Sequence, residues 1–181
     1  MLPFFRKQAI AAGPHEFGAE VEIERPVSEV YPLLDLADPR HAKRQLGDRV
    51  QAVTGEPGTF TMVISELPDA VFKLAVNAEE HEREYAFSCV SEPTFGRVAR
   101  SHERYVLEDL GEHGCRLILT QTIEFDRELS EDEYGMEAMM LTFAGFSVLA
   151  KLKLHAEEGV EAVKAMSDAQ SAALGKFDCL D

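Results

Sequence analysis

One predicted strand, residues 97–107, is more polar than a core strand needs to be. Its residues alternate, so Ser101, Glu103 and Tyr105 share one side of an extended chain. The next predicted strand places Gln121 on its own apolar side, where it would lie beside these residues. A carboxyl group withdrawn from water has a raised pKa and can act as a general base on an acidic C–H bond. Glu103 and Tyr105 are therefore the candidate catalytic residues, with Ser101 and Gln121 as candidate ligand contacts.

A second interpretation treats the same segment as an edge strand with no site. Arg97, Arg100 and Arg104 lie close enough in sequence to pair with Glu103, or water can solvate all four charges. The pattern alone does not determine which side of residues 97–107 faces the interior. Both interpretations are left open by the sequence.

A second group of residues is suited to contact an apolar molecule. Met136, Met139, Met140, Phe143 and Phe146 recur at steps of three or four, which predicts one face of a helix. Methionine adapts its shape to a ligand and phenylalanine provides apolar walls. We expect this face to turn toward the interior, where it lines a cavity or packs as ordinary core.

Three predicted strands, residues 59–65, 71–78 and 84–90, supply further apolar side chains. Their alternation and the turn residues between them predict neighbouring antiparallel strands. The side chains expected on the inner face, and therefore candidate ligand contacts, are Phe60, Met62, Phe72, Leu74, Tyr85 and Phe87.

The elements that position these residues predict an α+β fold. A strand at residues 19–24 is followed by a short helix, kinked at Pro32, and then by the remaining strands of a curved antiparallel sheet of six to seven strands. Ser130 and Glu133 have the spacing of a capping box, which predicts the start of one helix of about 30 residues, roughly 45 Å long. We expect a lead-in at 1–16, a single domain at 17–166 and a tail at 167–181.

Charge and cysteine usage narrow the function classes. The chain of 181 residues carries 33 acidic and 18 basic residues, a formal net charge of −15, which disfavours nucleic-acid and anionic-membrane partners. The cysteines Cys89, Cys115 and Cys179 are far apart and form no C-x-x-C pair, as expected in a reducing compartment. The apolar run at 138–150 is shorter than the ~18 residues of a membrane helix. We predict a cytoplasmic protein without integral membrane association.

The order of these elements resembles the START-like superfamily, also called SRPBCC, whose members have the helix-grip fold. The resemblance rests on residues 21–31 (VEIERPVSEVY), on the following 33–35 (LLD), and on the Met/Phe-rich C-terminal helix. It covers about residues 17–166. It implies a cavity between sheet and helix that takes an apolar or amphipathic small molecule. The superfamily shares no single catalytic set, so no catalytic residue is transferred from it.

Metal and cofactor motifs are missing from the sequence. Asp38 and His41 have the spacing of the iron site in the oxygenase branch of that superfamily, but position 46 is Leu where a second His is needed. Neither a phosphate-binding glycine motif nor a G-x-S-x-G elbow occurs. Cys89 is expected to be a small buried apolar residue and not a nucleophile. We predict no metal and no cofactor.

Three functions are left open at this stage. The first is binding or carriage of a hydrophobic or amphipathic small molecule. The second is an enzyme of the polyketide cyclase or dehydrase kind, with acid–base chemistry at Glu103. The third is a protein-interaction module like the chaperone-activating members, which an exposed apolar patch would favour. The ligand and the oligomeric state are not determined by the sequence.

Overall fold

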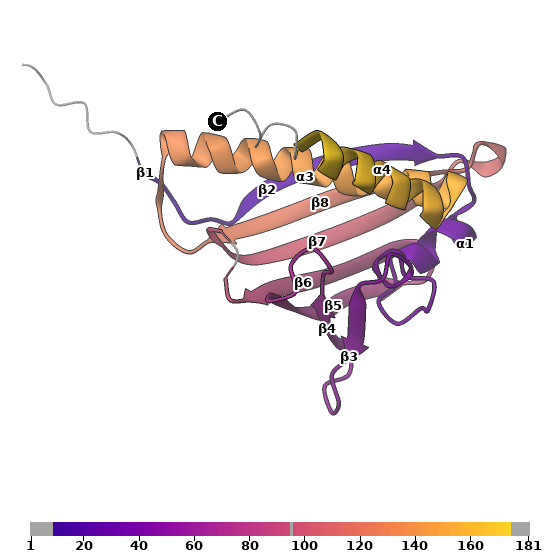
Figure 1. The fold of residues 1–181 in the computed structure, drawn as a ribbon, viewed down its shortest axis with the longest axis horizontal. Helices are drawn as coiled ribbons and strands as arrows, with labels where there is room; N and C mark the ends of the chain where they lie inside the picture. The colour runs from indigo at the N-terminus through magenta and orange to yellow at the C-terminus, as the bar shows by residue number, and fades with distance from the viewer. Residues whose placement is uncertain (1–8, 95, 175–181) are drawn as a thin grey trace, which may run out of the picture.

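The computed structural model describes residues 9–94 and 96–174 (Figure 1). Its elements in chain order are β1 (Ala9–Ile10), β2 (His15–Ile23), α1 (Val27–Val30), the 3-10 helix η1 (Tyr31–Leu33), α2 (Ala42–Gln45), β3 (Arg49–Ala52), β4 (Thr59–Val63), β5 (Val71–Glu80), β6 (Glu84–Glu92), β7 (Val98–Asp109), the 3-10 helix η2 (Gly111–His113), β8 (Cys115–Phe125), β9 (Leu129–Ser130), α3 (Glu131–Glu158) and α4 (Val160–Leu174).

Seven strands form one antiparallel sheet in the order β2-β8-β7-β6-β5-β4-β3. Strands β3 to β8 follow one another as a meander, and β2 joins by pairing with β8 along its whole length. Alternating exposure along β2 confirms the period-two pattern, with Glu20 and Glu22 turned to solvent and Ile23 buried. The α+β, helix-grip architecture predicted from the sequence is confirmed.

Two prolines shape the segment after β2. Pro26 stands immediately before α1, and α1 gives way to η1 at Tyr31, one residue before Pro32. Proline has no N–H to donate, so the α-helix does not continue regularly through this position. The α-helix is short, as predicted, and is followed by a 3-10 helix at Pro32. Tyr31, Leu33 and Leu34 are buried in the core.

The long C-terminal helix begins as predicted and ends earlier than predicted. The Ser130 hydroxyl accepts from the Glu133 N–H, and the Glu133 carboxylate accepts from the Ser130 N–H, so the capping box is complete. Gly159 has a φ of 90°, which an L side chain rarely adopts, and it ends α3. The chain then turns back along α3 as α4 (Figure 1). The expectation of one continuous helix is therefore wrong.

Secondary structure occurs on both sides of the residues 17–166 that were predicted as the domain. Strand β1 lies within the expected lead-in and pairs with β9 at the start of α3. Residues 167–174, expected in a tail, belong to α4. The remaining tail, 175–181, lies outside the described residues, as does 1–8 of the lead-in.

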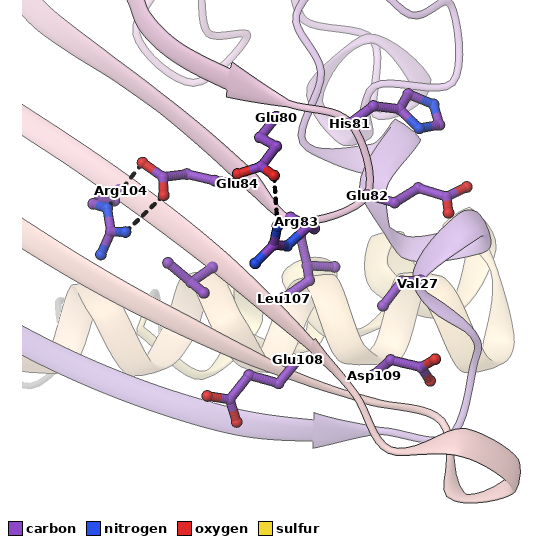
Figure 2. A pocket seen from close by; sticks show the side chains of 11 residues that line it. Val27, Glu80, His81, Glu82, Arg83, Glu84, Arg104, Leu107, Glu108 and Asp109 are labelled. Atoms are coloured by element: carbon purple, nitrogen blue, oxygen red, sulfur yellow. Dashed lines mark hydrogen bonds and ion pairs between the residues drawn. The ribbon is translucent and has the colours of Figure 1, made fainter.

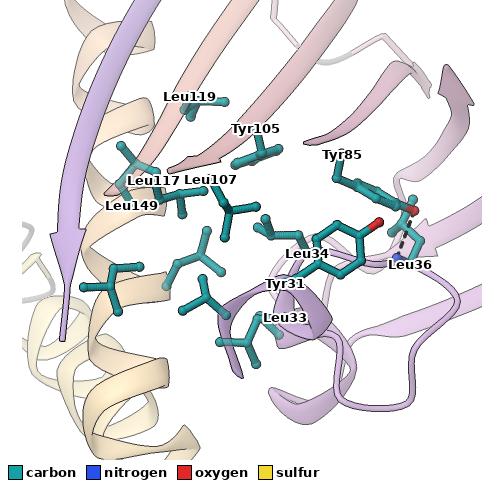
Figure 3. Packing of buried hydrophobic residues seen from close by; sticks show 14 of the residues in the cluster. Tyr31, Leu33, Leu34, Leu36, Tyr85, Tyr105, Leu107, Leu117, Leu119 and Leu149 are labelled. Carbon is teal, nitrogen blue, oxygen red and sulfur yellow. Dashed lines mark hydrogen bonds between the residues drawn. The ribbon is translucent and has the colours of Figure 1, made fainter. Parts of the chain in front are cut away.

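The core lies between the inner face of the sheet and the segment of α1 and η1 (Figure 3). The 3-10 helix η1 contributes Tyr31 and Leu33 to this core, and the residues just after it contribute Leu34 and Leu36. These side chains share the core with Tyr85 and other inward side chains of the strands. Helix α3 closes one side of this core by packing mainly against β2, with Leu149 and Leu152 buried.

Candidate functional site

Glu103 lies on the inner face of the sheet, on the interior strand β7. Glu103 on β7 is paired with Gln121 on β8 and with Phe87 on β6. Directly paired residues of an antiparallel sheet point to the same side. Tyr105 and Ser101, two positions away on either side of Glu103, share that side. The direction of residues 97–107, which the sequence left open, is therefore inward at these three positions.

Hydrogen bonds join three of these polar side chains. The Tyr105 hydroxyl donates to Glu103 Oε2 at 2.6 Å, and the Gln121 side chain also hydrogen-bonds the Glu103 carboxyl. Burial raises the pKa of Glu103 above its usual value, and the bonds from Tyr105 and Gln121 offset part of that rise. Burial and the adjacent Glu103 raise the pKa of Tyr105 well above its usual value. The pair therefore favours a protonated phenol beside a carboxyl group that is reluctant to ionise.

The arginines near Glu103 in sequence have other partners. Arg97 pairs with Glu133 and Glu137 of α3, and Arg104 pairs with Glu84 at 2.6 Å. Arg100 is exposed, and β7 lies between β6 and β8 instead of at an edge. The alternative of a solvated or arginine-paired edge strand is therefore wrong for Glu103.

Aromatic and sulfur-bearing side chains surround the carboxyl group. The rings of Phe87 and Tyr105 are stacked with centroids 6.2 Å apart. Cys89 hydrogen-bonds Ser101, and burial together with Glu103 raises the pKa of its thiol to about 12. A thiol with that pKa stays protonated near neutral pH, so Cys89 has the character of a small apolar residue, as expected.

Helix α3 comes close to the site at a glycine. A Cβ atom added at Gly145 would lie 3.0 Å from Gln121 Oε1 and 3.9 Å from a methyl group of Leu119. Gly145 therefore lets α3 pack directly against the Gln121 amide that bonds Glu103. The sequence carries no signal that connects this glycine to the site, because a glycine has no side chain for a residue pattern to register.

The six apolar strand residues predicted at the inner face divide into two groups. Phe60, Leu74 and Tyr85 are fully enclosed in the core, and the Tyr85 hydroxyl accepts from the Leu36 N–H at 3.0 Å. The other three are only partly buried against the core, and they are Met62, Phe72 and Phe87. A molecule on the inner face can reach the second group, whereas the first group holds the fold together.

The Met/Phe stripe of α3, defined as Met136, Met139, Met140, Phe143 and Phe146, does not face the sheet. These side chains are 51% to 76% exposed, whereas Gly145, Leu149 and Leu152 on the opposite side of the helix are buried. The expectation that the stripe turns toward the interior is wrong. The helix is apolar on nearly every side, so the close contact at Gly145, and not the apolar pattern, decides which side is buried.

Two hollows in the surface differ in character, and neither is lined by Glu103. The first, about 660 Å³, lies at the β5–β6 turn, and its charged side chains include the ion pairs Glu80–Arg83 and Glu84–Arg104 (Figure 2). The second, about 460 Å³, is mostly apolar and lies between β2, α3 and α4, with Phe146 and Met166 in its wall. The predicted cavity between sheet and helix is not confirmed.

Asp38 and His41, the residues considered for iron binding, have no further candidate metal ligand beside them among the described residues. Asp38 pairs with Arg40 at 2.8 Å, and burial lowers the pKa of His41 to about 4. Within residues 9–94 and 96–174, no group of three His, Cys, Asp or Glu side chains is placed to hold a metal ion.

The fold has known counterparts among solved structures. The DynU16 crystal structure, a putative protein in the dynemicin biosynthetic locus, superposes with a TM-score of 0.60 at 17% identity over 80% of this chain. Only 48% of that chain is covered, so this protein spans about half of its length. Ara h 8.0201 matches with a TM-score of 0.55 at 12% identity, over 77% of this chain and 98% of its own. A START superfamily protein from Mycobacterium smegmatis matches with a TM-score of 0.51 at 10% identity, over 77% and 97%.

The chain has the START-like, helix-grip fold. No protein-family model and no curated protein matches its sequence. At these identities the solved structures establish the START-like fold and leave the ligand and any reaction to be argued from the residues.

Proposed function

We propose that this START-like protein binds an apolar small molecule that carries a hydrogen-bond donor, with Glu103 as the polar anchor. The observation that supports the proposal is a half-buried carboxyl group on the inner face of the sheet, hydrogen-bonded by the neutral side chains of Tyr105 and Gln121. A carboxylate has about four acceptor positions, and Tyr105 and Gln121 provide two donors. A hydroxyl or amine on a ligand would fill a further position.

The apolar part of such a ligand would contact the partly buried side chains beside Glu103. Phe87 lies next to Glu103 across the β6–β7 pair, and Met62 pairs with Phe72 between β4 and β5. Glu103 is only half-buried, so part of its surface is open to a ligand, although neither of the two hollows described above is lined by it.

Two fluorescent probes test the anchor. Aminoanthracene offers an amine donor, and anthracene has the same rings without one. We expect Glu103→Gln to weaken aminoanthracene binding by roughly tenfold and to leave anthracene unchanged, because the Gln side chain has one acceptor oxygen where the carboxyl group has two. Glu108→Gln is the matched control, since Glu108 is exposed on the same strand and pairs with Arg116.

Organic extraction of the purified protein, followed by mass spectrometry, provides an independent readout. An apolar compound bearing a hydroxyl or amine is the expected result. Failure of both probes to bind, with no compound extracted, would overturn the proposal. Equal weakening of both probes by Glu103→Gln would show that Glu103 does not act as the anchor.

An enzymatic alternative is favoured by one observation, the raised pKa of Glu103 beside the Tyr105 hydroxyl. A carboxylate of raised pKa is a stronger base and can take a proton from a carbon next to a carbonyl group. Deuterium exchange at the α-carbon of a β-ketoacyl thioester, above the rate in buffer and lost in Glu103→Gln, would support a cyclase- or dehydrase-like activity. Exchange at the buffer rate in the wild type would exclude this chemistry for that substrate class.

A further inference from the structure

The outer face of α3 is an apolar surface that the described residues leave largely exposed, with α4 bordering it at Phe146 through Met166. The five side chains of the Met/Phe stripe are 61%, 67%, 51%, 76% and 53% exposed, in chain order. No charged residue occurs between 138 and 150. Large apolar side chains gathered on one exposed surface are uncommon in monomers and mark interaction sites.

The size of this surface suits an interface between proteins. Large side chains of this kind present ~150–250 Å² each, so five at about 60% exposure offer on the order of 600 Å². That equals the largest apolar patch on a typical monomer, and a stable interface needs about 800 Å² per partner. The exposed Thr142, Ala144 and Ala150 on the same helix extend the surface toward that value.

We propose that the Met/Phe stripe is the interface of a two-fold dimer in which the α3 helices of two copies lie antiparallel. The charges at the two ends of the stripe support this direction. Glu131 and Asp132 begin the helix, and Lys151 follows the apolar stretch. Antiparallel helices bring each acidic end against the lysine of the other copy, whereas parallel helices would bring like charges together.

One register satisfies the apolar and the charged contacts together. With the two-fold axis at residue 141, Phe143 meets Met139 of the second copy, and Phe146 meets Met136 of the second copy. The same register brings Lys151 within one residue of Asp132 of the second copy, and Asp132 lies on the same side of α3 as the stripe. Sulfur–aromatic contacts between methionine and phenylalanine are favourable, and a two-fold axis repeats each contact twice.

A lipid surface is the main competing occupant. Helix α3 is long and apolar enough to cross a membrane by length and composition, with a mean hydropathy of 1.3 over its most apolar 18 residues. Helices that lie on membranes usually carry Lys and Arg on the polar face, whereas α3 begins with Glu131, Asp132 and Glu133. The chain's net charge of −15 also opposes approach to an anionic bilayer. Charge therefore favours a second copy.

Light scattering after size exclusion, on the full chain from low micromolar to several hundred micromolar, tests the dimer. We expect the wild type to dimerise and Phe143→Glu to weaken the dimer by thirtyfold or more, roughly the cost of losing a central interface residue. Val71→Glu is the control, because Val71 is another exposed apolar residue, 41% exposed, on β5. It should leave the dimer unchanged, and circular dichroism should show both variants folded.

Disulfide cross-linking tests the direction and register in a Cys179→Ser background. A Met136→Cys copy mixed with a Phe146→Cys copy should form a cross-link, and neither should cross-link alone. Cross-linking of each variant with itself, with no cross-link between the two different variants in the mixture, would overturn the antiparallel arrangement. The same background without added cysteines reports any contribution from Cys89 and Cys115.

Three results would overturn the dimer itself. The first is a monomer at the highest concentration. The second is a monomer that sediments with phosphatidylcholine vesicles and loses this binding in Phe143→Glu, which would assign the stripe to lipid. The third is a monomer that dimerises only after residues 1–8 or 175–181 are deleted, which would mean that an end of the chain covers the stripe. None of these outcomes bears on ligand binding at Glu103.

Discussion

The inner face of β7 and the outer face of α3 are unusual in opposite ways. The first places an ionisable side chain among apolar ones, and the second exposes apolar side chains to water. On the inner face, a carboxyl group, Glu103, lies among apolar side chains and is bonded by Tyr105 and Gln121. On the outer face, Met139 and Phe143 lie in water, 67% and 76% exposed. Buried polar groups and exposed apolar patches are the informative exceptions in a folded protein. The two faces are therefore the two places to look for function, and they suggest different partners.

The two exceptions are connected through one helix. Gly145 contacts Gln121 on the inner side, and Phe143 and Phe146 project on the outer side within two residues of it. A ligand that moves α3 away from β8 would also move the Met/Phe stripe. Substitutions on the two sides of α3 separate the two roles.

The largest expected difference lies between Leu149→Ala and Phe143→Ala. Leu149 is 1% exposed on the sheet side of α3, so its truncation leaves a cavity and should lower the free energy of unfolding by about 3 kcal/mol. Phe143 is 76% exposed, so its truncation should change that free energy by less than ~0.5 kcal/mol at low protein concentration. Urea unfolding monitored by circular dichroism measures both. A large loss in Phe143→Ala would mean that the stripe is covered within a single chain.

The next expected difference compares two glycines of α3. Ala in place of Gly135, which has no atom within 4 Å of the added Cβ, should stabilise the protein by about 0.5–1 kcal/mol through helix propensity. The same change at Gly145 should instead destabilise it by about 1–2 kcal/mol, because the Cβ crowds Gln121 and disturbs its bond to Glu103. Thermal and urea unfolding of the two variants provide the comparison. A gain at both positions would show that Gln121 is free to move aside.

The sequence was sufficient for the sheet because its signals are local. Alternation in β2, the turn glycines and prolines, and the Ser130–Glu133 capping box each specify structure within a few residues. The inward position of Glu103 follows from the same alternation, once the pairing with Gln121 is known. The fold and the polar part of the candidate site were therefore within reach of the sequence.

The direction of the Met/Phe stripe was not within reach. A helix that is apolar on nearly all sides has no unique inner face, and Gly145 has no side chain for a hydrophobic pattern to detect. The buried side is decided by how closely α3 approaches β8, which is a property of the tertiary packing. The turn back at Gly159 was missed for a related reason, since a glycine inside an apolar pattern does not reveal its φ angle.

A smaller effect is expected in the pH dependence of stability at Glu103. Because the folded-state pKa of Glu103 is raised above 4.5, the folded state favours the protonated form. The contribution of Glu103 is then fully present below pH 4.5 and is lost as pH rises through the raised pKa. The wild type should lose stability relative to Glu103→Gln in that window, by about 1.4 kcal/mol per pH unit at most. Urea unfolding at a series of pH values checks this, and parallel profiles would mean that the carboxyl group is solvated.

The smallest effect is expected at Glu133, whose pKa is shifted in the opposite direction to that of Glu103. Arg127 and the Ser130 N–H and hydroxyl lower the pKa of Glu133 to about 2. The folded state therefore favours the charged form, so its contribution is present above pH 4.5 and is lost as pH falls toward 2. Glu133→Gln should reduce the loss of unfolding free energy on acidification. Glu103→Gln should alter the dependence of unfolding free energy on pH only above pH 4.5. Two half-exposed carboxyl groups in one small domain would then have pKa values shifted in opposite directions, because Glu103 lies among apolar side chains with neutral donors and Glu133 lies beside an arginine at a helix start.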